Sequence, residues 1–214
     1  MAPKLYYDQV SPPSRAVLMC VKAIGVDVDI IEINVFRGDH HKSDLIKINP
    51  LRTVPTLVDN DFVLCDSHAI MAYLVGKYGK DKSLYPEDLQ KRAIIDQRLH
   101  FDSGVFFARH LRAVVSVLMG AKVVAEEHVK AVNEAYGFLE IFLQDNKYIA
   151  GDSLSIADFS ILNTITNANV LIPVAENTYP KITTWRNLLK SLPYHEVNQI
   201  GMEAFKSAIK SKLM

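Results

Sequence analysis

Apolar residues in positions 1–80 form short segments of two kinds, each bounded by turn-forming residues. Runs rich in Val, Ile, Leu and Tyr predict strands; they are residues 4–7, 28–35, 56–58 and 62–64. Helical spacing of apolar residues predicts helices at residues 16–24, 43–48 and 67–78. The cluster Asp59-Asn60-Asp61 joins the last two strands into a hairpin. With a right-handed crossover between the first two strands, this order predicts a small thioredoxin-like α/β domain.

Beyond a polar, turn-rich connector at residues 79–86 the pattern changes, and only helical periodicity is evident. Helices are expected at residues 87–119, 126–144, 155–171, 181–191 and 203–213. A change in composition of this kind marks a domain boundary. The expected fold class is an α/β thioredoxin-like N-terminal domain at residues 1–80 and an all-α C-terminal helical domain at residues 87–214.

The clearest helix start in the second part is Ser155-Ile156-Ala157-Asp158. A serine at the cap position and an acid three residues later form a capping box, in which each side chain satisfies an amide at the helix start. Removing such a cap costs about 1 kcal/mol of stability. We therefore expect this motif to be structural rather than chemical.

The chain has 214 residues, of which 49% are hydrophobic and 22% charged, as is typical of folded globular proteins. Its 24 Lys and Arg residues equal its 24 Asp and Glu residues, which argues against a nucleic-acid or anionic-membrane partner held by bulk charge. No apolar run reaches the roughly 18 residues of a transmembrane helix, and no signal peptide is evident. We expect a cytoplasmic protein that binds neither nucleic acid nor membrane.

Two cysteines, Cys20 and Cys65, lie far apart in apolar surroundings. Free cysteine is among the most buried residue types, so both are expected to be buried structural thiols. The sequence has no Cys-x-x-Cys motif and no Cys/His spacing typical of zinc. No metal site is therefore expected.

The loop Ser11-Pro12-Pro13-Ser14 lies where a redox protein of thioredoxin-like fold would carry two cysteines. Serine hydroxyls stand at both positions where such a protein has its cysteine sulfurs, which excludes disulfide exchange by this loop. A hydroxyl at the positive end of a helix can stabilise an anion, including a thiolate. The alternative is an ordinary serine cap on a proline-initiated helix that ends before Gly25.

Two further loops contain candidate binding residues. In Thr53-Val54-Pro55-Thr56, a cis bond before the proline would expose the backbone of Val54 to an extended peptide; the alternative is a proline at a strand start. In Asp66-Ser67-His68, Ser67 could offer an amide and a hydroxyl to a carboxylate, and Asp66 could bind an ammonium group. The alternative there is helix capping. Together the three loops fit a small acidic peptide that carries a thiol.

These motifs resemble those of the cytosolic glutathione S-transferases, and they are most similar to the insect delta and epsilon classes, with a lean to epsilon. The likeness extends over nearly the whole chain. The matching segments are Leu5-Tyr6-Tyr7, Ser11-Pro12-Pro13-Ser14-Arg15, Gly38-Asp39-His40, Asn49-Pro50, Thr53-Val54-Pro55-Thr56-Leu57, Asp66-Ser67-His68-Ala69-Ile70-Met71-Ala72-Tyr73-Leu74, Tyr78-Gly79-Lys80-Asp81, Leu84-Tyr85-Pro86, Leu99-His100-Phe101-Asp102-Ser103-Gly104 and Ser155-Ile156-Ala157-Asp158.

The resemblance implies an enzyme, a glutathione transferase that forms a homodimer, with glutathione as co-substrate and no metal. Ser11 would be the catalytic residue: its hydroxyl would favour the thiolate of glutathione, which attacks a second, apolar electrophile. Detoxification of xenobiotics, dehydrochlorination and reduction of organic hydroperoxides all occur in the family, and no residue selects among them. The glutathione-binding residues carried over are Ser11, His40, Arg52, Val54, Pro55, Asp66, Ser67, His68 and Arg109.

Some of these assignments leave alternatives open. Similar epsilon-class proteins commonly have a histidine where this chain has Arg52, which keeps a donor for the glycyl carboxylate of glutathione and is always charged. Arg109 and Arg112 could face glutathione or a partner subunit. A pocket for the second substrate is expected between the domains, although its residues could instead form helix-bundle core or dimer interface. They are Phe107, His110, Val114, Leu118 and Phe205.

Two other functions fit the same fold. One is a non-catalytic carrier of hydrophobic ligands, against which intact binding residues such as Ser11 and Val54 argue. The other is a glutathione-dependent thiol–disulfide oxidoreductase. That activity would need a cysteine at position 11 or 14, or a mixed disulfide at Cys20 or Cys65.

Overall fold

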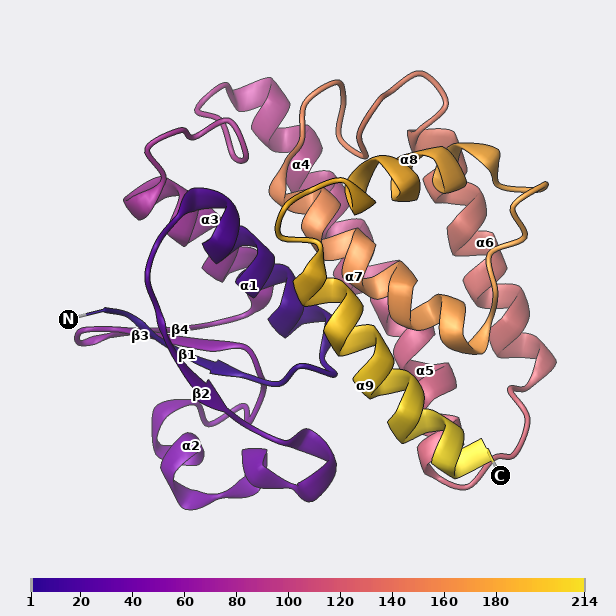
Figure 1. Cartoon of the computed structure of the whole chain (residues 1–214), viewed down its shortest axis with the longest axis horizontal. Coiled ribbons are helices and arrows are strands. Elements are labelled where there is room, and N and C mark those ends of the chain that lie inside the picture. Colours follow the sequence, from indigo (N-terminus) through magenta and orange to yellow (C-terminus); the bar gives the residue numbers. More distant parts are fainter. Residues whose placement is uncertain (1, 214) are drawn as a thin grey trace.

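The computed structural model describes residues 2–213 and contains a four-stranded sheet in the order β2-β1-β3-β4 (Figure 1). The strands are β1 (Lys4–Tyr7), β2 (Asp29–Glu32), β3 (Thr56–Asp59) and β4 (Phe62–Cys65). β1 pairs with β2 in parallel, whereas the β1–β3 and β3–β4 pairs are antiparallel. The predicted α/β arrangement with its closing hairpin is confirmed.

Helix α1 (Pro12–Ile24) leads from β1 to β2 and packs against α3 (Ser67–Tyr78). Ser11 caps its start, and Gly25 ends it in the left-handed region with φ 67°. Glycine adopts that conformation at little cost because it has no Cβ. The local sequence therefore determines both ends of this helix, as the pattern predicts.

The segment after β2 differs from the strand expected at residues 28–35. β2 ends at Glu32, and the chain continues through two short 3₁₀ turns, η1 (Val35–Arg37) and η2 (Asp39–His41), into helix α2 (Ser43–Ile48). The carboxylate of Asp8 accepts the amide proton of Val35 at 2.7 Å, and Asn34 Oδ1 accepts that of Arg37 at 2.9 Å. These side-chain acceptors replace a neighbouring strand, so the strand stops earlier than its composition suggests.

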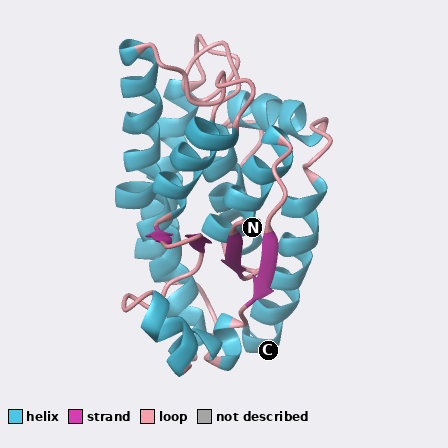
Figure 2. Cartoon of the chain, turned by 90° about the vertical axis from the view of Figure 1, so that its left-hand side faces the viewer, coloured by secondary structure: helices cyan, strands magenta, loops and turns pink. Residues whose placement is uncertain are grey.

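The rest of the chain is helical, and Figure 2 shows helices on both sides of the small sheet. The helices are α4 (Leu89–Phe101), α5 (Phe107–Leu118), α6 (Glu126–Phe142), α7 (Ile156–Leu171), α8 (Pro180–Lys190) and α9 (Glu196–Leu213). The single helix expected at residues 87–119 is interrupted, because a π-helical turn, η3 (Asp102–Phe106), separates α4 from α5. Within residues 2–213 no helix is long and apolar enough to cross a membrane.

Helix α9 begins at Glu196 rather than at residue 203, and it packs against α1 and α7, beside which it lies in Figure 1. It runs without a break through Gly201. A Cβ at this position would overlap the side chain of Arg15 and the carbonyl of Gln9. Glycine lowers helix propensity, which accounts for the late start in the sequence pattern, and the close packing of α9 on α1 offsets that cost.

Helix α7 lies at the centre of the helical part and is buried along most of its length. The predicted capping box at its start is confirmed, with Asp158 accepting the Ser155 amide at 2.9 Å. Asp158 is fully buried, and it also accepts from Ile149 N at 2.9 Å and from Trp185 Nε1 at 2.8 Å. The carboxylate therefore ties α7 to α8 and to the loop before α7, which is more than a cap does.

Candidate active site

A cavity of about 560 Å³ lies between loops of the N-terminal part and the helices α5 and α9. Most of the residues that the sequence predicts for the site line it. Those from the N-terminal part form the polar wall, which consists of Ser11, Arg52, Val54, Pro55, Asp66, Ser67 and His68. Those from the helical part form the apolar wall, which consists of Phe107, His110, Val114, Leu118 and Phe205.

Ser11 lies in the polar wall at the start of α1. Its Oγ accepts the amide proton of Ser14 at 3.4 Å, as a helix cap does. Because the oxygen is an acceptor in this bond, the hydroxyl proton is available for a ligand in the cavity. Ser14 has no such access, since it is fully buried. The capping interpretation and the anion-binding interpretation of Ser11 are therefore compatible.

Arg15 is a fully buried cation one helical turn after Ser11. Its guanidinium donates to Asn163 Oδ1 at 3.0 Å, to Asn167 Oδ1 at 2.6 Å and to the carbonyls of Gln9 and Asn163. All of these acceptors are neutral. Burial lowers the pKa of Arg15 to about 10, so the group is still charged at neutral pH. No role for Arg15 is predicted from the sequence, although a lone arginine on an apolar helix face is a recognisable signal.

The loop before β3 is organised by Asn49, which is almost fully buried. Its Nδ2 donates to Thr53 Oγ1 at 3.1 Å and to Thr56 Oγ1 at 2.9 Å, and so fixes both ends of the segment that contains Val54 and Pro55. The Val54–Pro55 bond is cis, which is the condition that the sequence analysis set for an exposed Val54 backbone. This role of Asn49 is not predicted from the sequence.

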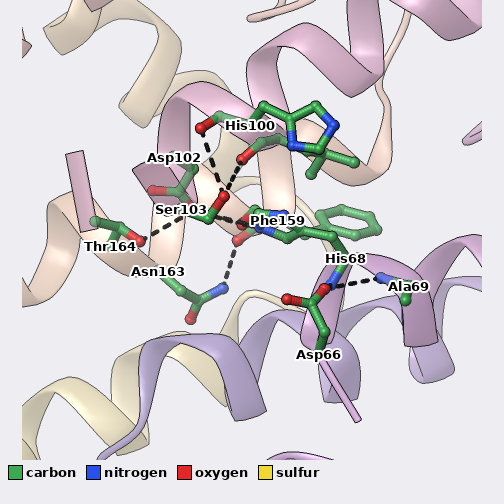
Figure 3. Close-up of polar contacts among 11 residues, drawn as sticks. Asp66, His68, Ala69, His100, Asp102, Ser103, Phe159, Asn163 and Thr164 are labelled. Carbon is green, nitrogen blue, oxygen red and sulfur yellow. Dashed lines mark hydrogen bonds and ion pairs between the residues drawn. The ribbon is translucent and has the colours of Figure 1, made fainter. Parts of the chain in front are cut away.

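Asp66 and His68 lie at the start of α3, where Figure 3 shows them beside residues of the helical part. Asp66 Oδ1 accepts the amide protons of His68 at 2.9 Å and Ala69 at 3.1 Å, so the expected cap is present. The backbone of Asp66 has φ 77°. A non-glycine residue in this region costs about 1–3 kcal/mol, and such residues cluster at functional sites.

A hydrogen-bonded chain connects His68 to the helical part. His68 Nε2 lies 2.8 Å from Ser160 Oγ, and that hydroxyl donates to Asp102 Oδ2 at 2.5 Å. Thr164 Oγ1 also donates to Asp102 Oδ2, at 3.3 Å (Figure 3). Asp102 is buried at the first position of the π-helical turn η3, and its Oδ1 has no partner among residues 2–213. Single π-helical turns occur often at functional sites. No role for Asp102 or Ser160 is predicted from the sequence, because both residues are distant from His68 along the chain.

The apolar wall belongs to both the cavity and the helical core. Val114 and Phe205 are buried and pack with Val117 and Ile209, whereas Leu118 is partly exposed. His110 is buried against Phe205, with ring centroids 6.1 Å apart. Burial, with a smaller contribution from Arg15, lowers the pKa of His110 to about 3, so its ring is neutral at ordinary pH. The apolar wall is therefore both a lining of the cavity and a part of the helical core.

The two cysteines differ from each other. Cys20 is fully buried, as predicted, and burial raises the pKa of its thiol to about 12. The prediction is wrong for Cys65, which is only half-buried and lines the cavity, because the end of β4 opens onto it. Within the described part of the chain, no group of His, Cys, Asp and Glu residues is arranged to hold a metal ion.

Two residues predicted for glutathione binding do not line the cavity. His40 lies in η2, half-buried beside His41, and burial lowers the pKa of its ring. Arg109 faces α6, where its Nη1 donates to the Ala131 carbonyl at 2.9 Å and pairs with Glu134 at 2.7 Å. The helical spacing that turns residues 107 and 110 to the cavity turns residue 109 away. The geometry therefore gives no support to the assignment of Arg109.

The two walls have complementary chemistry. The polar wall presents a hydroxyl at a helix start, with the charge of Arg15 buried behind it. Both features favour an anion. The apolar wall offers carbon surface and one neutral ring. This arrangement suits a bound thiolate that faces an apolar reaction partner.

Comparisons with known proteins agree with this chemistry. Residues 5–82 match the family described as "Glutathione S-transferase, N-terminal domain", and residues 94–193 match "Glutathione S-transferase, C-terminal domain". Glutathione S-transferase 1 of Manduca sexta is 41% identical over 217 residues, with 100% of each chain covered.

Two solved structures are similar over nearly the whole chain. A crystal structure of a glutathione transferase homologue from Drosophila mojavensis with bound glutathione has a TM-score of 0.95 and 44% identity, and covers 99% of this chain and 97% of that one. An epsilon-class glutathione S-transferase from the housefly, Musca domestica, has a TM-score of 0.94 and 42% identity, with 98% of each chain covered.

Proposed function

The chain belongs to the glutathione S-transferase family, and we propose that Ser11 activates the thiol of its co-substrate, glutathione. The protein is a glutathione transferase whose relatives include insect delta-class and epsilon-class enzymes. The observation that carries the proposal is the hydroxyl of Ser11, which lines the cavity at the start of α1 and keeps its proton free to donate.

Ser11 and its surroundings can supply the free energy that is needed to lower the pKa of the glutathione thiol. A free thiol has a pKa of about 8.5, and lowering it by two units requires about 2.7 kcal/mol of preferential stabilisation of the thiolate. One charge-assisted hydrogen bond from Ser11 and the start of α1 contribute an amount of this order. The buried charge of Arg15 acts in the same direction. The activated sulfur then attacks an electrophilic carbon of the second substrate.

The other groups of glutathione are assigned to residues of the polar wall. The backbone of Val54 pairs with the cysteinyl residue, and Asp66 and Ser67 hold the ammonium and carboxylate of the γ-glutamyl end. Arg52, a cavity residue, takes the glycyl carboxylate. Its fixed charge makes this contact insensitive to pH, unlike a histidine at the same position. His40 is assigned to the outer part of the glycyl end, because it does not line the cavity.

We place the second substrate, a hydrophobic electrophile, against the apolar wall. In this proposal, residues 1–80 bind glutathione and residues 87–214 bind the second substrate. Detoxification of xenobiotics is the proposed role. Dehydrochlorination and hydroperoxide reduction are further activities to be assayed, since both need the same activated thiolate.

A homodimer and a cytoplasmic location are part of the same proposal. The edge strand β4 exposes Phe62 and Val63, and exposed apolar side chains on a sheet edge favour contact with another chain. Both cysteines of the described chain are free thiols, which suits a reducing compartment.

The deciding experiment compares wild type with Ser11→Ala in the conjugation of glutathione to 1-chloro-2,4-dinitrobenzene. We expect kcat/KM to fall about 100-fold, and the pKa of bound glutathione, read from thiolate absorbance, to rise. Ser14→Ala is the matched control, because this neighbouring serine is buried and does not line the cavity. An unchanged rate in Ser11→Ala would overturn the assignment. A wild type that binds hydrophobic ligands without glutathione affinity would indicate a carrier, and a mixed disulfide at Cys65 would indicate an oxidoreductase.

A further inference from the structure

A second cavity, of about 340 Å³, lies between α7, α8 and α9 and shares no lining residue with the first. It is near the lower end of the size range of small-molecule sites, about 300–1,000 Å³. The lining residues are Leu162, Thr166, Arg186, Lys190, His195, Asn198, Gln199 and Met202. Two are cationic and none is acidic, so the cavity carries positive charge although the chain as a whole is neutral.

Arg186 is the first sign that this cavity holds a ligand. Its side chain is partly buried, yet it has no hydrogen-bond acceptor and no ion-pair partner among residues 2–213. Burial lowers the pKa of Arg186, while Tyr136 and Glu176 act against this effect. A guanidinium presents a planar set of donors that matches carboxylates and phosphates. Lys190, on the same side of α8, donates within residues 2–213 only to the neutral Asn187.

Asn198 is the second, independent sign. It lines the cavity and is 1% exposed, and its Nδ2 donates to Thr166 Oγ1 at 2.9 Å. Thr166 in turn donates to the Leu162 carbonyl. The Oδ1 of Asn198 is buried and accepts no hydrogen bond from the described chain. A buried polar atom without a partner is uncommon, and a hydroxyl donor in the cavity would satisfy this one.

We propose that this cavity is a binding site for a small hydroxylated organic anion. Its carboxylate or phosphate pairs with Arg186 and Lys190, and a hydroxyl group donates to Asn198 Oδ1. Leu162 and Met202 supply apolar surface for the carbon skeleton. This site is separate from the glutathione cavity and does not depend on the role of Ser11.

The site is tested by calorimetric titration of the full-length protein at low ionic strength, with S-hexylglutathione present so that the first cavity is occupied. The probes are glycerol 3-phosphate, malate and inorganic phosphate; the first two distinguish a phosphate ligand from a carboxylate ligand. We expect saturable binding of at least one organic anion, and weaker binding of inorganic phosphate, which has no carbon skeleton. Absence of saturable binding by both organic anions would overturn the proposal.

Variants assign the binding to this cavity. Arg186→Gln is expected to lower the affinity for the probe about tenfold or more, because a charge-assisted pair is lost. Lys181→Gln, the matched control, removes a charge from the same helix outside the cavity and is expected to change the affinity less than twofold. Conjugation activity of Arg186→Gln should equal that of wild type, which shows that the variant folds. Equal weakening in both variants, or none in Arg186→Gln, would contradict the assignment.

Discussion

The polar wall and the apolar wall of the cavity are held in place by different interactions. On the polar wall, each loop is fixed by named hydrogen bonds: Ser11 caps α1, Asn49 ties the segment before β3, and Asp66 caps α3. On the apolar wall, Val114 and Phe205 are fixed by packing on neighbouring apolar residues. Hydrogen bonds specify one geometry, whereas packing tolerates change of similar volume. We therefore expect substitutions to act sharply on the polar wall and gradually on the apolar wall.

The largest effect is expected from Arg15→Met, which removes the cation buried behind the polar wall. Asn163 and Asn167 lose their donor, and because each buried acceptor left without a partner costs about 1–3 kcal/mol, the free energy of unfolding should fall by about 2–6 kcal/mol. Urea unfolding followed by the fluorescence of Trp185 measures the change. Arg112→Met, at an exposed position on α5, is the control and should change stability by less than about 0.5 kcal/mol. Similar stability of the two variants would contradict the view that hydrogen bonds hold the polar wall.

A smaller, pH-dependent effect is expected from His110→Leu on the apolar wall. Because the pKa of His110 falls from 6.5 to about 3 on folding, the unfolded chain binds a proton that the folded protein excludes. Stability therefore decreases as the pH falls from about 6.5 towards 3. His110→Leu should remove this loss, which at pH 5 amounts to about 2 kcal/mol.

Acid unfolding curves of His110→Leu and wild type test this directly. His100→Leu is the control, because His100 is exposed at the end of α4. A parallel decrease in the stability of His110→Leu and wild type between pH 7 and pH 5 would show that His110 titrates freely in the folded protein.

The smallest effect is expected from Leu118→Ala, which trims a partly exposed residue of the apolar wall. The KM for a hydrophobic electrophile should rise about threefold, in line with the loss of limited apolar contact, and the KM for glutathione should not change. Steady-state kinetics with each substrate varied in turn provide the measurement. Met119→Ala is the control, because its side chain is 84% exposed and does not line the cavity. A larger change in the KM for glutathione than in the KM for the electrophile would contradict the assignment of Leu118 to the apolar wall.

Local sequence predicted what local interactions determine. The caps of α1, the hairpin from β3 to β4 and the capping box at Ser155 each depend on a few neighbouring residues, and all three are confirmed. Most of the polar wall follows from these elements, since its residues stand at the starts of helices or strands. The resemblance to a known family added roles to those positions.

Contacts between distant segments could not be predicted in the same way. The chain from His68 through Ser160 to Asp102 joins three separate elements, and a one-dimensional pattern does not show which polar residues meet. The direction of Arg109 depends on the register of α5 after the π-helical turn, which no hydrophobic period signals. The side-chain partners of Arg15, Asn163 and Asn167, likewise come from the distant helix α7.

Gly201 does not line the cavity, but it lies in the same helix, α9, as the lining residue Phe205. Because position 201 has no side chain, α9 lies directly on Arg15, and Phe205 reaches the apolar wall from the same helix. Any larger residue at position 201 would push this end of α9 away from Arg15 and so shift Phe205 relative to the rest of the cavity. We therefore expect a substitution at position 201 to alter the range of second substrates although this residue does not line the cavity, so a search for specificity determinants confined to the pocket lining would miss it.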